Sequence, residues 1–416
     1  MGDEQVVWEG VPGFVDRAYY TNFWHPMPRH AWADLSAAEL LTAEVSTRSP
    51  LGWGPFAMHV WVAGDSIVLK RNPFYFRASD GLPRVDEVTF RFIRDTDELI
   101  SHLTAGTCDV VSHEAAAALE LDELVAQPGV VAHTAPANTW ELLAFGITPV
   151  RDLDRPDVFE DVRVRRGIAQ CIDRQTLVDE AVGSGGRVLH SYVPPEHPAY
   201  AGEQLTAWAH DAEAGQRLLA EAGWYDEDGD GVREAHSVPE IPDGTPYRVT
   251  CKTADDPMRV STARLIKDQL SACGISVTVQ IEPVQMLFGP GPEGSLFGRR
   301  FDLAQFSWQL APEPLCDAFL SSQMPGQGDW NRPNVAGFID ARFDAACEEA
   351  LETLPGSADY LAAQGPPQRI FSEQLPVLPL YQHQKTTLTQ SNVSGLSPNA
   401  SQPSELWNLE EIDVQW

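Results

Sequence analysis

Phe56, Met58, Val60 and Val62 recur with a period of two, and a second predicted strand at residues 66–70 follows a short Ala-Gly-Asp turn. A period of two is typical of strands with one buried face. Proline and glycine residues precede the first stretch, and an Arg-Asn-Pro run follows the second. Because these residues end strands and form turns, the pattern predicts a β-hairpin over residues 51–76.

The rest of the chain mixes predicted strands with predicted helices. Further strands are predicted at residues 85–93, 108–111, 138–149, 247–251, 275–281, 301–308 and 378–381. Helical spacing occurs at residues 95–104, 164–182, 258–273, 348–354 and 367–374. A helix between two strands at 247–281 is typical of parallel strands in an α/β domain. Residues 138–149 carry few charges, which predicts burial on both faces of a sheet.

Length and composition limit the class of protein. A chain of 416 residues is long enough for two or three domains, and 43% hydrophobic residues is ordinary for a globular protein. No apolar run approaches the roughly 18 residues of a membrane-spanning helix. The first ten residues, MGDEQVVWEG, lack the basic and apolar regions of a signal peptide, so none is predicted.

The net charge of −31 excludes one class of partner. Nucleic-acid binding needs clustered lysine and arginine, whereas acidic residues are spread along this whole chain. The charge is therefore interpreted as that of a solubilised, self-repelling surface.

Six cysteines leave the disulfide pattern open. They are Cys108, Cys171, Cys251, Cys273, Cys316 and Cys347. None forms a C-x-x-C pair, so the spacing supports neither a zinc ribbon nor a redox motif. Pairing of sequence neighbours would give Cys251–Cys273 and Cys316–Cys347, and the alternative is that most are small buried hydrophobic residues.

Several segments carry a family resemblance. The hairpin LGWGPFAMHVWVAGDSIVLKRNPFYF at 51–76 resembles a segment of the extracellular solute-binding proteins of the peptide/nickel class, family 5, of ABC transporters. FEDVRVRRGIAQCIDR at 159–174 and LWNLEE at 406–411 are similar to two other segments of that family. The resemblance runs in order from about residue 10 to residue 416.

The resemblance implies a two-lobed α/β fold of the periplasmic-binding-protein type, class II, cluster C. Lobe I is expected at residues 1–150 and 385–416, and lobe II at residues 151–384. Family members carry a first strand and a small subdomain before the segment at 27–32. The expected fold is therefore one truncated at its N-terminus.

The implied function is that of a binding component of an ABC importer. It would capture a small solute (an oligopeptide, an oligosaccharide or a metal chelate) and deliver it to the membrane subunits of the permease. The resemblance implies a monomer that is extracellular or periplasmic, tethered to the membrane in the full-length protein. The alternative is an enzyme or a sensory domain that reuses this fold. No G-x-S-x-G, H-E-x-x-H or P-loop motif occurs in the sequence, so no catalytic residue is assigned.

By resemblance, the strand at 301–308 and the residues after it line the ligand site. Ser307, Trp308, Gln309 and Leu310 occupy the ligand-lining positions, where a strand edge can bind an extended ligand. Peptide-binding members place an aspartate just after this tryptophan to pair with the α-ammonium of the ligand. Here that place is taken by Ala311, with Glu313 two residues later. The alternative for the tryptophan is a core aromatic between the lobes.

Two further sites are candidates. Trp140 stands where the family places an aromatic facing the ligand, or it is a half-buried interface residue. Asp226, Asp228 and Asp230 alternate before glycine, as oxygen ligands of Ca²⁺ do. The twelfth position of an EF-hand loop would here be Ser237 rather than glutamate, and the alternative is a plain surface turn. No other cofactor is expected.

Overall fold

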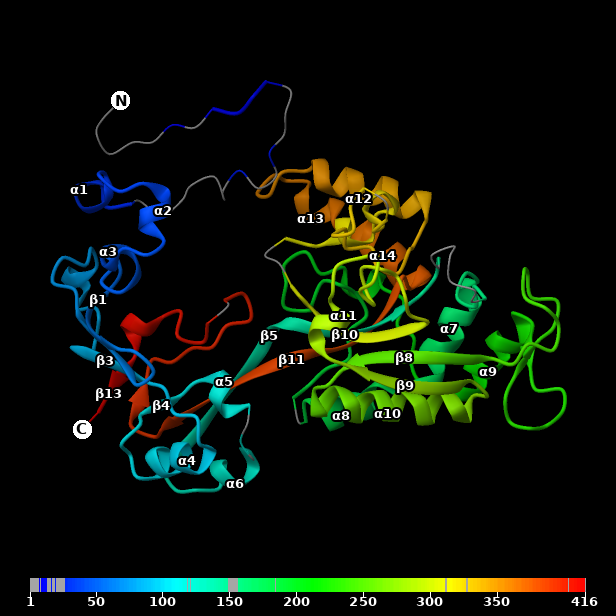
Figure 1. Cartoon of the computed structure of the whole chain (residues 1–416), viewed down its shortest axis with the longest axis horizontal. Coiled ribbons are helices and arrows are strands. Elements are labelled where there is room, and N and C mark those ends of the chain that lie inside the picture. Colours follow the sequence, from blue (N-terminus) through cyan, green and yellow to red (C-terminus); the bar gives the residue numbers. More distant parts are fainter. Residues whose placement is uncertain are drawn as a thin grey trace. The chain divides into compact units, whose positions relative to one another are not determined.

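The computed structural model describes residues 27–148 apart from 118 and 120, residues 156–415 apart from 184, 311, 312, 327 and 403, and residues 7, 9–12, 16 and 19. The chain folds into two compact units (Figure 1). Unit 1 contains Asn138–His383, and unit 2 contains Tyr20–Ala137 and Gln384–Trp416. The chain passes between them within two long strands, β5 (Val130–Phe145) and β11 (Val377–Gln390).

The main sheet has the strand order β4-β11-β5-β10-β8-β9. Three strands of this sheet belong entirely to unit 1, namely β8 (Arg248–Ala254), β9 (Ser276–Glu282) and β10 (Leu303–Gln309). The predicted strand–helix–strand pattern is confirmed, since β8 and β9 pair in parallel and α10 (Pro257–Ala272) connects them. In Figure 1, α10 lies against these strands, and the shorter α8 (Arg174–Ala181) lies beside α10. Strand β10 runs parallel to β8 but antiparallel to β5.

The predicted helix over 164–182 is wrong in one respect, because the structure has two helices there. Helix α7 (Val162–Cys171) begins after Asp161, whose carboxylate accepts the Arg163 amide at 2.8 Å. It ends at Ile172, whose backbone is extended. Asp173 then caps α8 by accepting the Gln175 amide, so a local capping residue interrupts the helical pattern.

The remaining elements of unit 1 surround the sheet. They are α9 (Ala212–Glu221), β6 (Trp224–Tyr225), β7 (Glu234–Ala235), α11 (Val284–Leu287), α12 (Ala341–Glu352), α13 (Tyr360–Ala363) and α14 (Gly365–Gln374). Helices α7 and α9 approach closely at a pair of glycines. A Cβ atom on Gly215 would lie 2.7 Å from the carbonyl oxygen of Gly167, so any side chain there would push the helices apart.

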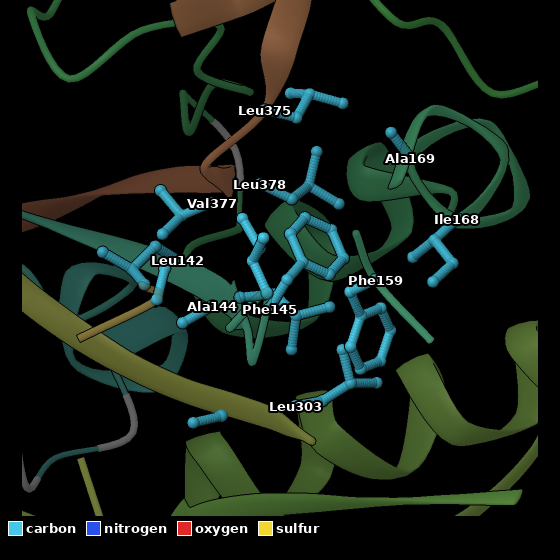
Figure 2. Packing of buried hydrophobic residues seen from close by; sticks show 14 of the residues in the cluster. Leu142, Ala144, Phe145, Phe159, Ile168, Ala169, Leu303, Leu375, Val377 and Leu378 are labelled. Atoms are coloured by element: carbon cyan, nitrogen blue, oxygen red, sulfur yellow. The ribbon is translucent and has the colours of Figure 1, made fainter. Parts of the chain in front are cut away.

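Figure 2 shows the hydrophobic core of unit 1. Phe145 at the end of β5 packs against Phe159, with ring centroids 5.6 Å apart. Leu303 of β10 and Leu378 of β11 are likewise fully buried. Each such side chain contributes about 1.5–3 kcal/mol through burial, so the core holds the three strands together.

Two disulfides lie in unit 1. Of the two pairs that sequence neighbours would form, Cys316–Cys347 is present and Cys251–Cys273 is not. Cys273 instead bonds to Cys171, which joins the end of α10 to the end of α7 across 102 residues of sequence. Cys251 lies inside the core on β8 as a free thiol, and burial raises its pKa to about 12. Sequence proximity indicated the wrong partner for Cys273, because the packing of α7 and α10 brings their ends, and thus Cys171 and Cys273, together.

Unit 2 contains the predicted hairpin. Strands β1 (Phe56–Val62) and β2 (Ser66–Arg71) pair antiparallel, and β3 (Glu87–Arg91) extends the sheet beside β2. The other elements of unit 2 are α1 (Arg29–Trp32), α2 (Ala37–Leu40), α3 (Glu44–Thr47), α4 (Thr96–Thr104), β4 (Val110–Val111), α5 (His113–Ala116), α6 (Leu121–Val125), β12 (Val393–Ser394) and β13 (Asp413–Val414). Leu103 and Leu388 are fully buried in a second core beneath α4.

Candidate functional site

Strand β10 is an inner strand where it begins and an open edge where it ends. It pairs with β8 only at Leu303 and Ala304, whereas its pairing with β5 continues to Gln309. The Leu310 amide also donates to the Asn138 carbonyl at 2.6 Å. The predicted edge strand is therefore found here as a half-strand with one free side.

The register shows which backbone groups face that free side. In an antiparallel ladder, alternate residues bond to the neighbouring strand. Leu310 bonds to β5, and Trp308 lies two residues before it, so the backbone of Trp308 also points to β5. The backbone groups of Ser307 and Gln309 consequently point away from β5. Among the described residues they have no strand partner on that side, so they are available to an added strand.

The two predicted tryptophans lie on one face of the sheet. Trp140 and Trp308 are direct register partners on β5 and β10. Trp140 is only 3% exposed and belongs to the core, whereas Trp308 is half-buried beside Phe306, with ring centroids 5.6 Å apart. Trp308 therefore presents the more accessible aromatic surface beside the open edge.

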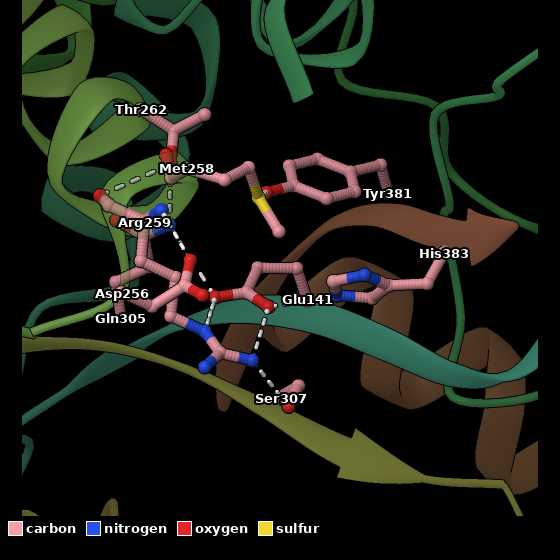
Figure 3. A network of polar contacts seen from close by, with 9 residues as sticks. All are labelled: Glu141, Asp256, Met258, Arg259, Thr262, Gln305, Ser307, Tyr381 and His383. Atoms are coloured by element: carbon pink, nitrogen blue, oxygen red, sulfur yellow. Dashed lines mark hydrogen bonds and ion pairs between the residues drawn. The ribbon is translucent and has the colours of Figure 1, made fainter. Parts of the chain in front are cut away.

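The opposite face of these strands carries a buried polar network, drawn in Figure 3. The Glu141 side chain is fully buried, directly opposite Ser307 in the register. Arg259, in the first turn of α10, donates from Nε to Glu141 Oε1 at 3.0 Å and from Nη2 to Ser307 Oγ at 2.7 Å. One guanidinium thus fixes β5 and β10 relative to each other.

Further donors complete the shell around the carboxylate. His383 of β11 donates from Nε2 to Glu141 Oε2 at 2.9 Å, which requires the proton on Nε2. Gln305 donates to Glu141 Oε1 at 3.3 Å and to Thr262 Oγ1 at 2.6 Å. A buried carboxylate is costly unless it is paired and hydrogen-bonded, and this one has both kinds of partner. The network holds β5, β10, β11 and α10 together.

Burial and the charges in the network together shift the pKa values of Arg259 and Tyr381. Burial alone would lower the pKa of Arg259, but the adjacent Glu141 carboxylate outweighs it and raises that pKa. Burial, and secondarily the charge of Glu141, raises the pKa of the Tyr381 hydroxyl. Tyr381 therefore stays protonated and donates to the Met258 sulfur at 3.2 Å.

The other predicted residues of this strand are distributed as follows. Gln309 is exposed at the end of β10, and Leu310 is half-buried. Ala311 lies outside the described residues. Glu313 is half-buried and lines a small hollow with Tyr360 and Gln364, away from the Glu141 network.

The acidic loop does gather its carboxylates. Oxygen atoms of Asp226, Asp228, Asp230 and Glu234 all lie within 4.8 Å of one another. The aspartates also cap the loop itself: Asp226 accepts the amides of Gly229 and Gly231 at 2.7 and 3.0 Å. Gly231, at the sixth loop position, has φ +89, which glycine adopts readily. The loop is thus preshaped for oxygen coordination, yet these contacts also suit a self-capped turn.

Sequence patterns did not identify Arg259, Gln305 or His383 as members of the site. Glu141 offered a signal, because it is the one charged residue in the apolar stretch 138–149. A charge in a strand expected to be buried requires a partner. The partners lie 118 and 242 residues away in sequence, so no local pattern could name them.

Comparison with known proteins identifies a family. A model described as bacterial extracellular solute-binding proteins, family 5 (middle part), matches residues 21–328. The chain is 25% identical over 308 residues to the oligopeptide-binding protein AppA of Bacillus subtilis, which is 72% of this chain and 51% of that protein. It is also 25% identical over 352 residues to the di/tripeptide-binding protein 2 of Pseudomonas aeruginosa, 83% of this chain and 58% of that protein. The chain thus spans a little over half the length of these relatives.

Solved structures share the fold. AppA from Bacillus subtilis in complex with a nonapeptide superimposes with a TM-score of 0.63 at 23% identity, covering 94% of this chain and 72% of that chain. NikZ from Campylobacter jejuni in complex with Ni(L-His) gives a TM-score of 0.64 at 17% identity, covering 93% of this chain and 72% of the NikZ chain. In the described part of this chain, no helix is both long and apolar enough to cross a membrane.

The network generates a stability prediction. Replacing Arg259 by methionine leaves the buried Glu141 carboxylate without its cation, and we expect a loss of about 3 kcal/mol in the free energy of unfolding. The matched control is Arg264→Met, the same change at an exposed position of the same helix, which we expect to cost less than about 0.5 kcal/mol.

Urea unfolding of both variants measures the difference, and Glu141→Gln in the Arg259→Met background should restore part of the loss. Equal stability of the two single variants would show that the ion pair does not hold the strands together.

Proposed function

The chain belongs to the bacterial extracellular solute-binding proteins of family 5, which are binding components of transporters, and from this membership we propose that it captures a small solute for an ABC importer. Its mixed α/β fold is that of the two-lobed periplasmic binding proteins. The proposed ligand is an extended oligopeptide. The observation that carries this proposal is the open edge of β10.

The open edge suits a peptide backbone. Ser307 and Gln309 present unpaired backbone groups toward the side where β8 has diverged, and strand addition satisfies such groups in any peptide sequence. Trp308 lies between them in sequence and offers a large apolar surface for the side chains of the ligand. The Arg259–Ser307 bond keeps this edge in place before the ligand arrives, which lowers the entropy cost of binding.

Names and titles of relatives support the same ligand class. AppA of Bacillus subtilis is named an oligopeptide-binding protein, and its solved structure contains a nonapeptide. Other solved relatives contain metal chelates, namely Ni(L-His) in NikZ and Fe(III)-EDTA in NikA from Brucella suis. We place the peptide first because a strand edge recognises backbone groups, which a chelate lacks.

The way in which the ligand's N-terminus is recognised is part of the proposal. An ammonium group is held most strongly by a carboxylate. By resemblance, Ala311 takes the position at which peptide-binding members carry an aspartate. Glu313 lies beside Tyr360 in its own small hollow. We therefore propose that binding relies on the peptide backbone more than on a free α-amino group.

The remaining parts of the proposal concern the whole protein. We propose that it acts outside the cytoplasmic membrane, as a monomer tethered to it, and delivers its ligand to the permease subunits. The division into lobe I (1–150 and 385–416) and lobe II (151–384) belongs to this proposal. An enzyme or sensory domain with the same fold is the alternative, and conversion of the bound ligand to product would support the enzyme.

A proline substitution tests the open edge directly. Gln309→Pro removes a backbone N–H that has no strand partner, so it should leave the fold intact and weaken peptide binding by roughly tenfold relative to Gln309→Ala. Native mass spectrometry of the purified protein identifies the bound peptides, and calorimetry with one of them gives the affinities. N-acetylation of that peptide should change its affinity less than Gln309→Pro does.

Equal affinity of the proline and alanine variants would exclude strand addition at β10. If no peptide co-purifies with the protein and no peptide of a library binds to it, peptides are excluded as the ligand class.

We also propose that the acidic loop holds Ca²⁺ as a structural ion. Four convergent carboxylates, with Gly231 in a left-handed conformation between them, favour a hard cation that takes oxygen ligands. The ion would link Asp226 to Glu234 across the turn before β7. This proposal is independent of the solute site.

Calcium should raise the melting temperature of the protein, whereas magnesium, which needs a smaller octahedral site, should raise it less. Asp228→Asn keeps the acceptor for the Asp230 amide but removes one charge, so it should abolish the calcium effect. Glu227→Gln is the matched control, because Glu227 is in the same loop but outside the cluster. If calcium raises the melting temperature of neither the unmodified protein nor the Glu227→Gln control, the loop is a self-capped turn.

A further inference from the structure

Unit 2 carries a second hollow that the proposed function does not use. Its volume is about 590 Å³, within the range of small-molecule sites. Four aromatic residues line it: Trp32, Trp53, Tyr75 and Phe76. They come from α1, from the segment before β1 and from the segment after β2; Figure 1 labels α1 and β1. Rings from separate segments thus surround one space.

Two of the four rings are largely exposed, whereas Tyr75 is buried, with 6% of its surface exposed. Trp53 is 70% exposed and Phe76 is 78% exposed, although both belong to a lined hollow rather than to an isolated surface position. Clustered exposed aromatics are costly in water and mark sites of binding. A ligand that covers them would recover that cost.

Polar contacts fix the walls of the hollow. The side-chain amide of Asn72 donates to the Gly54 carbonyl at 2.9 Å, and its backbone N–H donates to the Pro55 carbonyl at 2.8 Å. These two bonds tie the loop bearing Trp53 to the loop bearing Tyr75 and Phe76. Trp32 is held separately, since its Nε1 donates to the Val45 carbonyl at 3.1 Å. The hollow is therefore preorganised.

One charged residue lines the hollow among the described residues, and it is Glu410. Its Oε1 accepts from the Tyr75 hydroxyl at 3.3 Å and from Arg77 Nη1 at 3.0 Å, while its Oε2 has no hydrogen-bond donor in the described part of the chain. Burial, and then the Glu410 charge, raises the pKa of Tyr75, so this hydroxyl remains a donor. One carboxylate oxygen is left for a ligand.

The local charge favours a cation. Arg77 is shared among three carboxylates: it lies 3.0 Å from Glu410, 3.8 Å from Glu411 and 3.7 Å from Asp80. One positive charge against three negative ones leaves a local excess of negative charge. The net charge of the chain, −31, adds a long-range field of the same sign.

We propose that this hollow binds an organic cation, a primary ammonium or guanidinium group on an apolar carrier. The aromatic faces would attract the cation and cover the carrier, and Glu410 Oε2 would accept a charge-assisted hydrogen bond from it. The ligand of this site is thus distinct in chemistry from the peptide backbone proposed for β10.

The test compares n-butylammonium with n-butanol, its neutral counterpart of similar shape, by ligand-observed NMR titration. The ammonium should bind saturably and roughly tenfold more tightly than the alcohol. Glu410→Gln should remove that preference and leave alcohol binding unchanged. Trp53→Ala should weaken both ligands, and Phe74→Ala is the control, because Phe74 is 91% exposed outside the hollow.

Equal affinity for the two probes would overturn the proposal and identify an apolar hollow only, and so would an unchanged preference in Glu410→Gln. Absence of saturable binding by either probe would show that the hollow takes neither ligand. Circular dichroism confirms that each variant is folded. Gln309→Pro, which tests the solute site, should not alter this binding, so the two proposals fail separately.

Discussion

The buried carboxylate of Glu141 is the constraint on which the arrangement of unit 1 depends. A charge with no exposed surface is tolerated only when its partners are held in place, and here they come from α10, β10 and β11. The cost of separating them keeps the strands in one register. Arg259 extends that constraint to Ser307, which belongs to the free edge of β10. The same interaction thus organises the core and prepares the proposed binding edge.

Much of the fold follows from local patterns. Alternation predicted the hairpin that became β1 and β2, and the strand–helix–strand pattern predicted β8, α10 and β9. Local reasoning failed where distant packing decides. The helix predicted over 164–182 breaks at Ile172 because Asp173 caps a new helix, and Cys273 bonds to Cys171 because α7 and α10 end close together.

The candidate site was predictable only in part. The segment around Trp308 could be recognised by resemblance, and Glu141 stood out as a charge in an apolar strand. Its partners could not be found, because the contacts with Arg259 and His383 exist only after the strands have assembled. The extent of the free side of β10 could not be predicted from the sequence, since it depends on where β8 stops pairing after Ala304. Sequence thus indicates the strand, and tertiary structure defines what it can bind.

Hydrogen exchange at single-residue resolution tests the central claim most directly, because β10 alternates in its bonding. Without ligand, the amide of Trp308 should be protected by β5, whereas the amides of Ser307 and Gln309 should exchange quickly. Addition of a bound peptide should slow Ser307 and Gln309 and leave Trp308 nearly unchanged. Ligand binding without any new protection at these two amides would contradict the account.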